Sequence, residues 1–168
     1  MGQITKTPKV FISYSWDKDN PNHEIWVMKL ATDLRKNGVD AILDKFENRS
    51  GADLPHFMDA SVRDAGRVLC IITEKYTEKA NDLIGGVGYE YRNMTAEIYE
   101  KVNTNKFIPI LREGSFNKES IPTALFGRVA IDMRDDSKYE ERLEEILREL
   151  FNKPQYKKPP LGEAPNFD

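Results

Sequence analysis

A glutamate beside a glycine-rich loop is the first residue of this sequence whose position suggests chemistry. Glu90 follows the glycines of "GGVGYE", and the residues from Tyr89 to Val102 have the composition of a helix. A carboxylate at a helix N-terminus is favoured by the helix dipole, so Glu90 could be structural only. A loop that presents the carboxylate to a ligand is the other interpretation. Glu97 lies about two turns further along roughly the same face and is the alternative acidic group.

The glycine segment matches no common phosphate-binding loop. It lacks the Lys and the Ser or Thr of a Walker loop, and it also lacks the G-x-G-x-x-G spacing of a dinucleotide fingerprint. Cys70 lies in the apolar run "RVLCIIT" and is expected to be a small buried hydrophobe. The two histidines, His23 and His56, show no metal-ligand spacing. We therefore expect neither a metal nor a cofactor.

Length, charge and cysteine content narrow the class of protein. The chain of 168 residues suits one domain with its own core. The net charge is −3 without a basic run, which disfavours nucleic acid as a partner. No apolar stretch reaches the roughly 20 residues that a membrane span needs, and no signal peptide opens the chain. A single cysteine fits a reducing compartment, so a cytoplasmic location is expected.

Strand-like and helix-like segments alternate along the chain. Five short apolar runs are predicted as strands: 9–15, 39–44, 67–73, 106–111 and 129–133. Helices are predicted between them and after the last one: from Pro21 to Gly38, then over 54–66, 74–82, 89–102 and 137–151. Such alternation predicts a parallel sheet with helices on both faces. Within it, Pro109 hints at an edge strand or a strand end. The first helix shows Ile25, Met28 and Ala31 or Thr32 on one face. The last helix has an apolar face made of Tyr139, Leu143, Ile146, Leu147 and Leu150.

Polar and aromatic residues gather where the first strands end. In open parallel sheets a ligand binds beyond the carboxyl ends of the strands, near a switch in strand order. The residues at these ends are Ser13, Tyr14, Ser15, Trp16 and Asp17 after the first strand, Asp44, Phe46 and Arg49 after the second, and Thr73 and Tyr76 after the third. Each of them could also serve only as a cap, a packing residue or a solvated charge. Aromatic faces with hydroxyls and carboxylates suit a nucleotide-like ligand.

Domain boundaries are indicated by composition. Residues 1–8 are expected to be a leader or a tag remnant, and residues 9–152 form the folded domain. Residues 153–168 are rich in proline and are expected to be an extended linker toward a further, downstream domain.

Several segments, in order, resemble the TIR domain, and more narrowly the SEFIR-like branch found in bacteria. They are "KVFISYSWD", "GVDAILD", "GADLPHFMDASVRDAGRVLCIIT" and "GGVGYEYRNMTAEIY", and the similarity runs from about Pro8 to Phe151. The resemblance implies a flavodoxin-like three-layer α/β sandwich with five parallel strands. It also implies self-association through contacts between TIR domains.

Some TIR domains are scaffolds, whereas others cleave NAD⁺ between nicotinamide and ribose. The enzymatic ones use a glutamate at the start of the helix after the third strand, and Glu90 is the matching position. The resemblance implies that Tyr14, Ser15 and Trp16 line the nicotinamide and ribose. It places Asp44 and Phe46 at the root of the BB loop, which spans residues 45–53.

Two functions follow from the resemblance. The first is an NAD⁺ glycohydrolase effector, with NAD⁺ as substrate, that is switched on when a sensor domain assembles several copies. In bacterial TIR–STING fusions that sensor is a cyclic-dinucleotide-binding STING domain acting in defence against phage. The alternative is a non-enzymatic adaptor that acts by homotypic contacts. A receiver-like protein is disfavoured because the first strand end lacks paired acidic residues and a phosphate-cradling loop.

Overall fold

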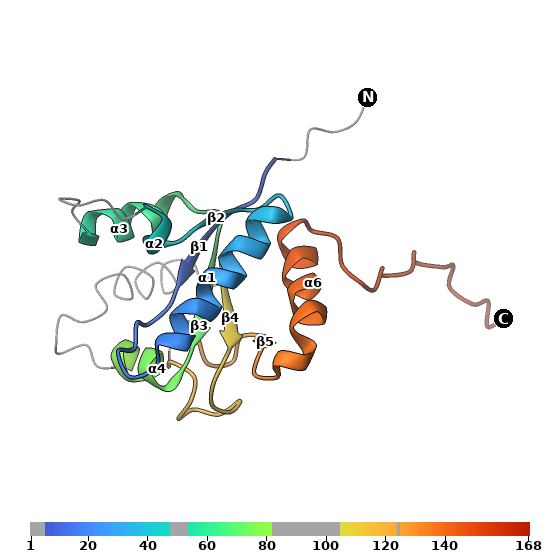
Figure 1. Ribbon diagram of the computed structural model, residues 1–168. Helices are drawn as coiled ribbons and strands as arrows, with labels where there is room; N and C mark the ends of the chain where they lie inside the picture. Colours follow the sequence, from blue (N-terminus) through green and yellow to red (C-terminus); the bar gives the residue numbers. More distant parts are fainter. Residues whose placement is uncertain (1–5, 48–53, 82–104, 124) are drawn as a thin grey trace.

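A five-stranded, all-parallel sheet forms the centre of the protein (Figure 1). The computed structural model describes residues 6–47, 54–81, 105–123 and 125–168. The strands lie in the order β2-β1-β3-β4-β5. Their bounds are β1 Lys9–Ser13, β2 Asp40–Ile42, β3 Arg67–Ile72, β4 Phe107–Leu111 and β5 Ile131–Asp132. The predicted parallel sheet and the flavodoxin-like class are confirmed.

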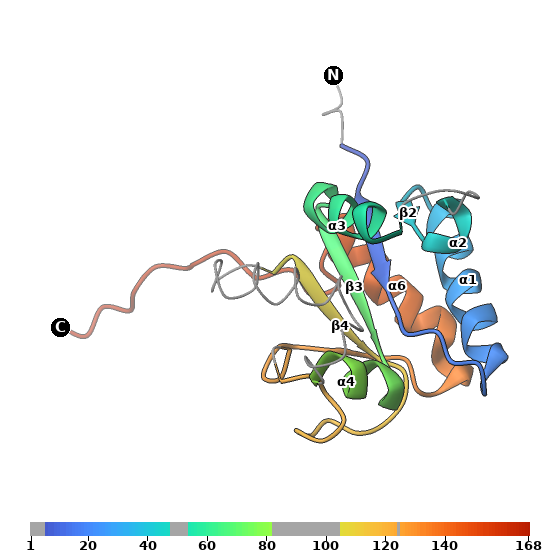
Figure 2. The same ribbon diagram turned by 90° about the vertical axis from the view of Figure 1, so that its left-hand side faces the viewer.

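Helices cover both faces of the sheet and make the fold three-layered (Figures 1 and 2). The helices α1 (Pro21–Lys36) and α6 (Tyr139–Leu150) pack on one face, and α3 (Leu54–Asp64) and α4 (Glu74–Asn81) pack on the other. Two shorter elements complete the described fold: α2 (Asp44–Glu47) and the 3₁₀ turn η1 (Asp136–Lys138). Gly38, with φ +85°, follows α1 and confirms the predicted helix end, because glycine accepts this backbone conformation without strain.

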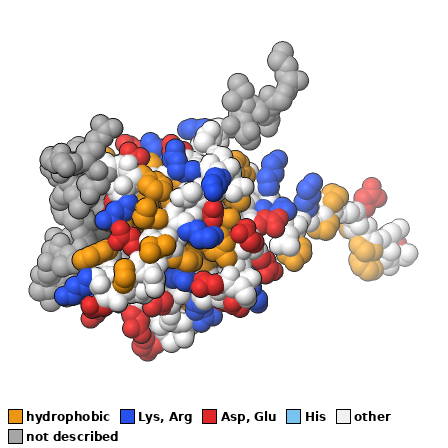
Figure 3. Space-filling view, viewed as in Figure 1, with side chains coloured by type: hydrophobic (Ala, Val, Ile, Leu, Met, Phe, Trp, Pro, Cys, Tyr) orange, Lys and Arg blue, Asp and Glu red, His pale blue; other side chains and the backbone are white. Residues whose placement is uncertain are grey.

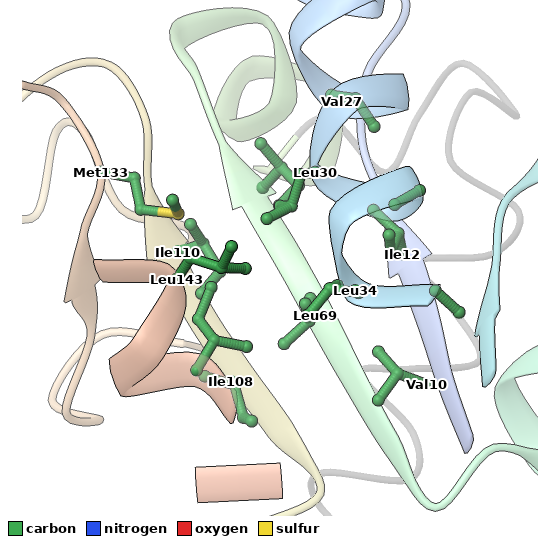
Figure 4. Packing of buried hydrophobic residues seen from close by; sticks show 14 of the residues in the cluster. Val10, Ile12, Val27, Leu30, Leu34, Leu69, Ile108, Ile110, Met133 and Leu143 are labelled. Atoms are coloured by element: carbon green, nitrogen blue, oxygen red, sulfur yellow. The ribbon is translucent and has the colours of Figure 1, made fainter. Parts of the chain in front are cut away.

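The alternation of side chains along each strand divides the core in two. In β1, Val10 and Ile12 face α1 and α6, whereas Phe11 faces α3 and α4. Figure 4 shows the first of these layers, with Leu30 and Leu34 of α1 directed toward the strands. Cys70 belongs to the second layer and is fully buried, as predicted.

The buried face of α1 differs from the expected one, of which Ala31 alone is buried. Ile25 and Met28 are 64% and 37% exposed, whereas the residues at helical spacing on the other side are buried. The buried residues are His23, Trp26, Val27, Leu30, Ala31 and Leu34. The apolar stripe that includes Trp26 is broader than the Ile25–Met28 pair, so it provides the larger buried area against the sheet.

Pro109 does not mark an edge strand, because β4 lies between β3 and β5. The register explains how a proline is accommodated there. Pro109 pairs with Cys70 of β3, but β5 pairs with β4 only at Ile110 and Leu111. At Pro109, β4 is therefore unpaired on the side that faces β5. Proline has no backbone N–H to donate, and on this side its absence breaks no hydrogen bond between strands.

The C-terminal segment extends away from the folded body (Figures 1 and 2). Residues 153–168 form no helix or strand and are exposed. Its extended form agrees with its proline content, and its role as a linker stays a prediction. Across the described ranges, no helix is long and apolar enough to cross a lipid bilayer.

Candidate functional site

The end of β1 lies at the point where the strand order changes direction. β1 pairs with β2 on one side and with β3 on the other, so the connections leaving β1 and β2 run to opposite sides. Ser13, the last residue of β1, is buried, and its Oγ lies 2.9 Å from the hydroxyl oxygen of Tyr76 in α4. Tyr76 is positioned in turn by its backbone N–H, which donates to Thr73 Oγ1 at 3.1 Å. A buried hydroxyl network therefore joins β1 to α4.

Tyr14 and Asp44 meet beside this network. The Tyr14 hydroxyl donates to Asp44 Oδ1 at 2.9 Å, and both residues are half-buried. Asp44 also accepts a hydrogen bond from the backbone N–H of Lys45 at 2.8 Å. The prediction that Asp44 ends the second strand was wrong: β2 ends at Ile42, and Asp44 begins the four-residue helix α2. The carboxylate caps the turn that follows and binds Tyr14 as well.

Ser15 and Trp16 differ in how far they are accessible. Ser15 is 5% exposed, and among the described residues its hydroxyl has only a long contact of 3.5 Å with the Trp16 carbonyl. The Trp16 side chain is 55% exposed. The Trp16 carbonyl accepts a hydrogen bond from Lys79 Nζ at 3.2 Å, which ties this loop to α4. Lys79 was not predicted as part of the site, although it lies one helical turn after Tyr76 and so shares its face.

Phe46 provides a second accessible ring, in α2, where it is 41% exposed. The helix α2 is also held to α1, because Lys45 Nζ lies 3.2 Å from Glu24 Oε1. Five residues expected to bind substrate thus lie around the ends of β1 and β2, with contacts that join β1 to α2 and α4. The residues are Tyr14, Ser15, Trp16, Asp44 and Phe46.

Glu90 and its alternative Glu97 lie outside the described residues, as do Arg49 and the rest of the predicted BB loop beyond Glu47. The catalytic assignment to Glu90 therefore stays a prediction. Within the described ranges, no group of three or more His, Cys, Asp or Glu side chains could hold a metal ion.

A neutral histidine lies behind the site. The ring of His23 meets the edge of Tyr14, with 6.3 Å between ring centroids. Burial, and then the positive charge of Arg112, lower the pKa of His23 below its ordinary value. At neutral pH the site is therefore flanked by an uncharged imidazole.

Charges of both signs are interspersed over the surface that α1 and α6 present (Figure 3). Hydrophobic side chains lie between them, without a continuous basic stripe on the described surface in this view.

The five-stranded parallel sheet is covered on both faces and carries polar and aromatic residues at its switch point, which defines a flavodoxin-like α/β domain. The family described as TIR domain matches residues 10–147. The chain belongs to the TIR-domain family.

Solved structures agree with this assignment. A prokaryotic SEFIR domain is 38% identical, with a TM-score of 0.68 over 86% of this chain and 99% of that one. The TIR domain of the Toll-related receptor TRR-2 from Hydra magnipapillata is 14% identical, with a TM-score of 0.61 over 84% and 96% of the two chains. The TIR domains of the activated Roq1 resistosome, which recognises the pathogen effector XopQ, are 14% identical to this chain. Their TM-score is 0.61 over 85% of this chain and 99% of that one. The last two likenesses show the fold alone. Among curated proteins, none matches the chain.

Proposed function

We propose that this TIR domain is an NAD⁺ glycohydrolase that becomes active when copies of it assemble. The observation that carries the proposal is the grouping of Tyr14, Asp44 and the accessible rings of Trp16 and Phe46 at one edge of the sheet. Aromatic faces suit the flat nicotinamide ring, and the polar pair suits ribose hydroxyls. Glu90, by its position in the sequence, is the proposed catalytic carboxylate.

The chemistry needs few groups. Nicotinamide in NAD⁺ is cationic, so the bond between its nitrogen and the ribose C1′ breaks with the electron pair going to that nitrogen. Neutral nicotinamide leaves, and positive charge develops on the ribose as an oxocarbenium-like state. A carboxylate that binds the ribose hydroxyls stabilises this charge. Water then adds to C1′ and releases a proton, giving ADP-ribose, whereas attack by a group of the substrate itself gives a cyclic product.

Assembly is part of the proposal because Trp16 and Phe46 are 55% and 41% exposed. A reacting sugar must be shielded from bulk water for electrostatic stabilisation to be strong. A second domain covering the two rings would provide that shielding. The proline-rich segment 153–168 is suited to joining the domain to a sensor that drives assembly. A cyclic-dinucleotide-binding STING domain in defence against phage is the proposed example of such a sensor.

The experiment measures nicotinamide release from NAD⁺ by the dilute protein and by the same protein clustered on a multivalent support. We expect release only from the clustered protein. Glu90→Gln should abolish it, while Glu97→Gln, a matched change two turns away, should retain it. Circular dichroism confirms that both variants are folded. The reverse pattern moves the catalytic role to Glu97, and absence of release from every clustered sample rejects the enzyme.

A non-enzymatic adaptor is the second candidate, favoured by the same exposed rings, since Trp16 and Phe46 could serve protein contact only. In that case Trp16→Ala should weaken self-association although clustered wild-type protein releases no nicotinamide.

A further inference from the structure

A polar cavity opens beside the first turn of α1, close to the ends of β4 and β5. Its volume is about 280 Å³. The lining residues are Asn20, Asn22, His23, Arg112, Glu113 and Arg134. None of them belongs to the proposed NAD⁺ site. The volume lies just below the range of about 300–1,000 Å³ that is usual for small-molecule pockets, so a compact ligand fits better than a dinucleotide.

His23 in the wall of this cavity lacks a hydrogen-bond partner where one is expected. Its side chain is 6% exposed, and Nε2 is shielded from solvent without a partner among the described residues. The ring is held between Tyr14, which meets it edge-on, and Trp26, which stacks on it at 6.4 Å. A buried polar nitrogen without a partner is unfavourable and uncommon. His23 also lines the cavity, so a small rotation of its ring would bring Nε2 to a ligand bound there, and the ligand would then provide that partner.

Arg112 offers a positive charge with unused donors. Its guanidinium lies 4.4 Å from the centre of the Trp26 ring and is largely covered. Only Nη1 is hydrogen-bonded within the described part of the chain, to the Met133 carbonyl at 2.9 Å and to Asp136 Oδ1 at 2.7 Å. An arginine has five N–H donors, so those on Nε and Nη2 remain for a ligand.

Arg134, by contrast, is already neutralised. Its Nε and Nη2 donate to the two carboxylate oxygens of Asp132, each at 2.9 Å, and its Nη1 donates to the Gly114 carbonyl. This pairing lowers the pKa of Asp132 to about 2. Arg134 therefore shapes the cavity wall and leaves Arg112 as the cation for a ligand.

The start of α1 adds partial positive charge to the same cavity. Asn20 is the N-cap residue, and its side chain makes no capping hydrogen bond. Pro21 has no N–H, and the N–H groups of Asn20 and His23 donate to the carbonyls of Asp17 and Asn20. Within residues 20–23 the Asn22 N–H is therefore left for a ligand, and the positive end of the helix dipole favours an anion. We propose that this cavity binds a compact phosphate-bearing anion, either inorganic phosphate or a small phosphate monoester, through Arg112, His23 and the first turn of α1. Glu113, which also lines the cavity, opposes the anion by its charge.

The chain contains only two histidines, so NMR can follow the site directly. Inorganic phosphate is titrated into the 168-residue protein while the imidazole ring signals of His23 and His56 are recorded. We expect the His23 signals to shift and saturate and the pKa of His23 to rise, because a bound anion stabilises the imidazolium. His56 and a sodium chloride titration at equal ionic strength are the controls. Equal shifts of both histidines, or no saturation, overturn the proposal.

Variants test the same site by calorimetry. His23→Phe keeps a ring stacked on Trp26 but removes both nitrogens, and we expect phosphate binding to weaken at least about fivefold. Arg112→Gln should weaken it by a similar factor or more, and Glu113→Gln should strengthen it about twofold. If Arg112→Gln fails to fold, His23→Phe and Glu113→Gln decide the matter. Unchanged affinity in both overturns the proposal. Repeating the series with ribose 5-phosphate shows whether free phosphate or a sugar phosphate is the better ligand.

Discussion

The Tyr14 hydroxyl donates to Asp44 across 30 positions of sequence, and the 2.9 Å bond joins the end of β1 to the first residue of α2. Asp44 accepts from the Lys45 N–H with the same oxygen, Oδ1. The side chain that caps the α2 turn thus also determines where that turn lies relative to Tyr14. Any ligand that contacts both residues meets a prearranged pair.

Removal of the Tyr14 hydroxyl should loosen α2. We expect Tyr14→Phe to lower the free energy of unfolding by about 1.5–3 kcal/mol, the usual contribution of a hydrogen bond to a carboxylate. It should also reduce nicotinamide release by clustered protein several-fold. Asp44→Asn keeps an acceptor oxygen, so we expect it to lower the free energy of unfolding, measured in urea, by less than Tyr14→Phe does. A larger loss for Asp44→Asn than for Tyr14→Phe would contradict this account.

The buried contact between Ser13 and Tyr76 should be energetically coupled. Ser13→Ala and Tyr76→Phe each remove one hydroxyl of a 2.9 Å pair and so deprive the other hydroxyl of this contact. The double variant removes both, so its loss of stability should be smaller than the sum of the single losses. We expect a coupling energy of about 1 kcal/mol from a cycle of urea unfolding experiments. Additive losses would show that the two hydroxyls do not depend on each other.

The burial of α1 predicts a contrast between two of its residues. Leu30 is fully buried, whereas Ile25 is 64% exposed. Leu30→Ala should lower the free energy of unfolding by about 2–5 kcal/mol through lost apolar contact and a residual cavity. Ile25→Ala should change it by no more than about 0.5 kcal/mol. Thermal or chemical unfolding measures both, and equal losses would reject the observed orientation of the helix.

The neutral state of His23 predicts a pH dependence. Its pKa lies below the ordinary value of 6.5, mainly through burial and then through Arg112, while Asp17 acts in the opposite direction. The unfolded chain therefore binds the proton more strongly than the folded one. The stabilising contribution is complete above pH 6.5 and is lost as the pH falls from 6.5 toward the lower pKa of the folded state.

His23→Phe should consequently flatten the decline in melting temperature over about pH 7.5 to 5.5, where carboxylates stay ionised. His56→Gln is the control for the second histidine and should leave the slope unchanged. The buffer must be free of phosphate, because a bound anion would raise the pKa of His23. If the melting temperature of His23→Phe declines with falling pH as steeply as that of the wild type, the pH dependence arises from other groups.

The sequence alone determined the class of fold. Short apolar runs alternating with longer amphipathic ones are local patterns, and an all-parallel sheet covered by helices is the arrangement that buries them. The burial of Cys70 and the apolar face of α6 were predicted for the same reason. Tyr139, Leu143 and Ile146 are indeed buried there, and Leu147 and Leu150 pack against the same core. The family resemblance also rested on motifs that can be read along the chain.

The tertiary structure decided which groups meet. The Tyr14–Asp44 bond, the Lys79 contact with the Trp16 carbonyl and the placement of His23 between Tyr14 and Trp26 depend on the packing of separate elements. The same is true of the buried face of α1, which is set by the area it covers on the sheet. Residue types and spacing specify local periodicity. The partner of a polar side chain depends on distances between elements, and these exist only once the sheet and its helices have packed.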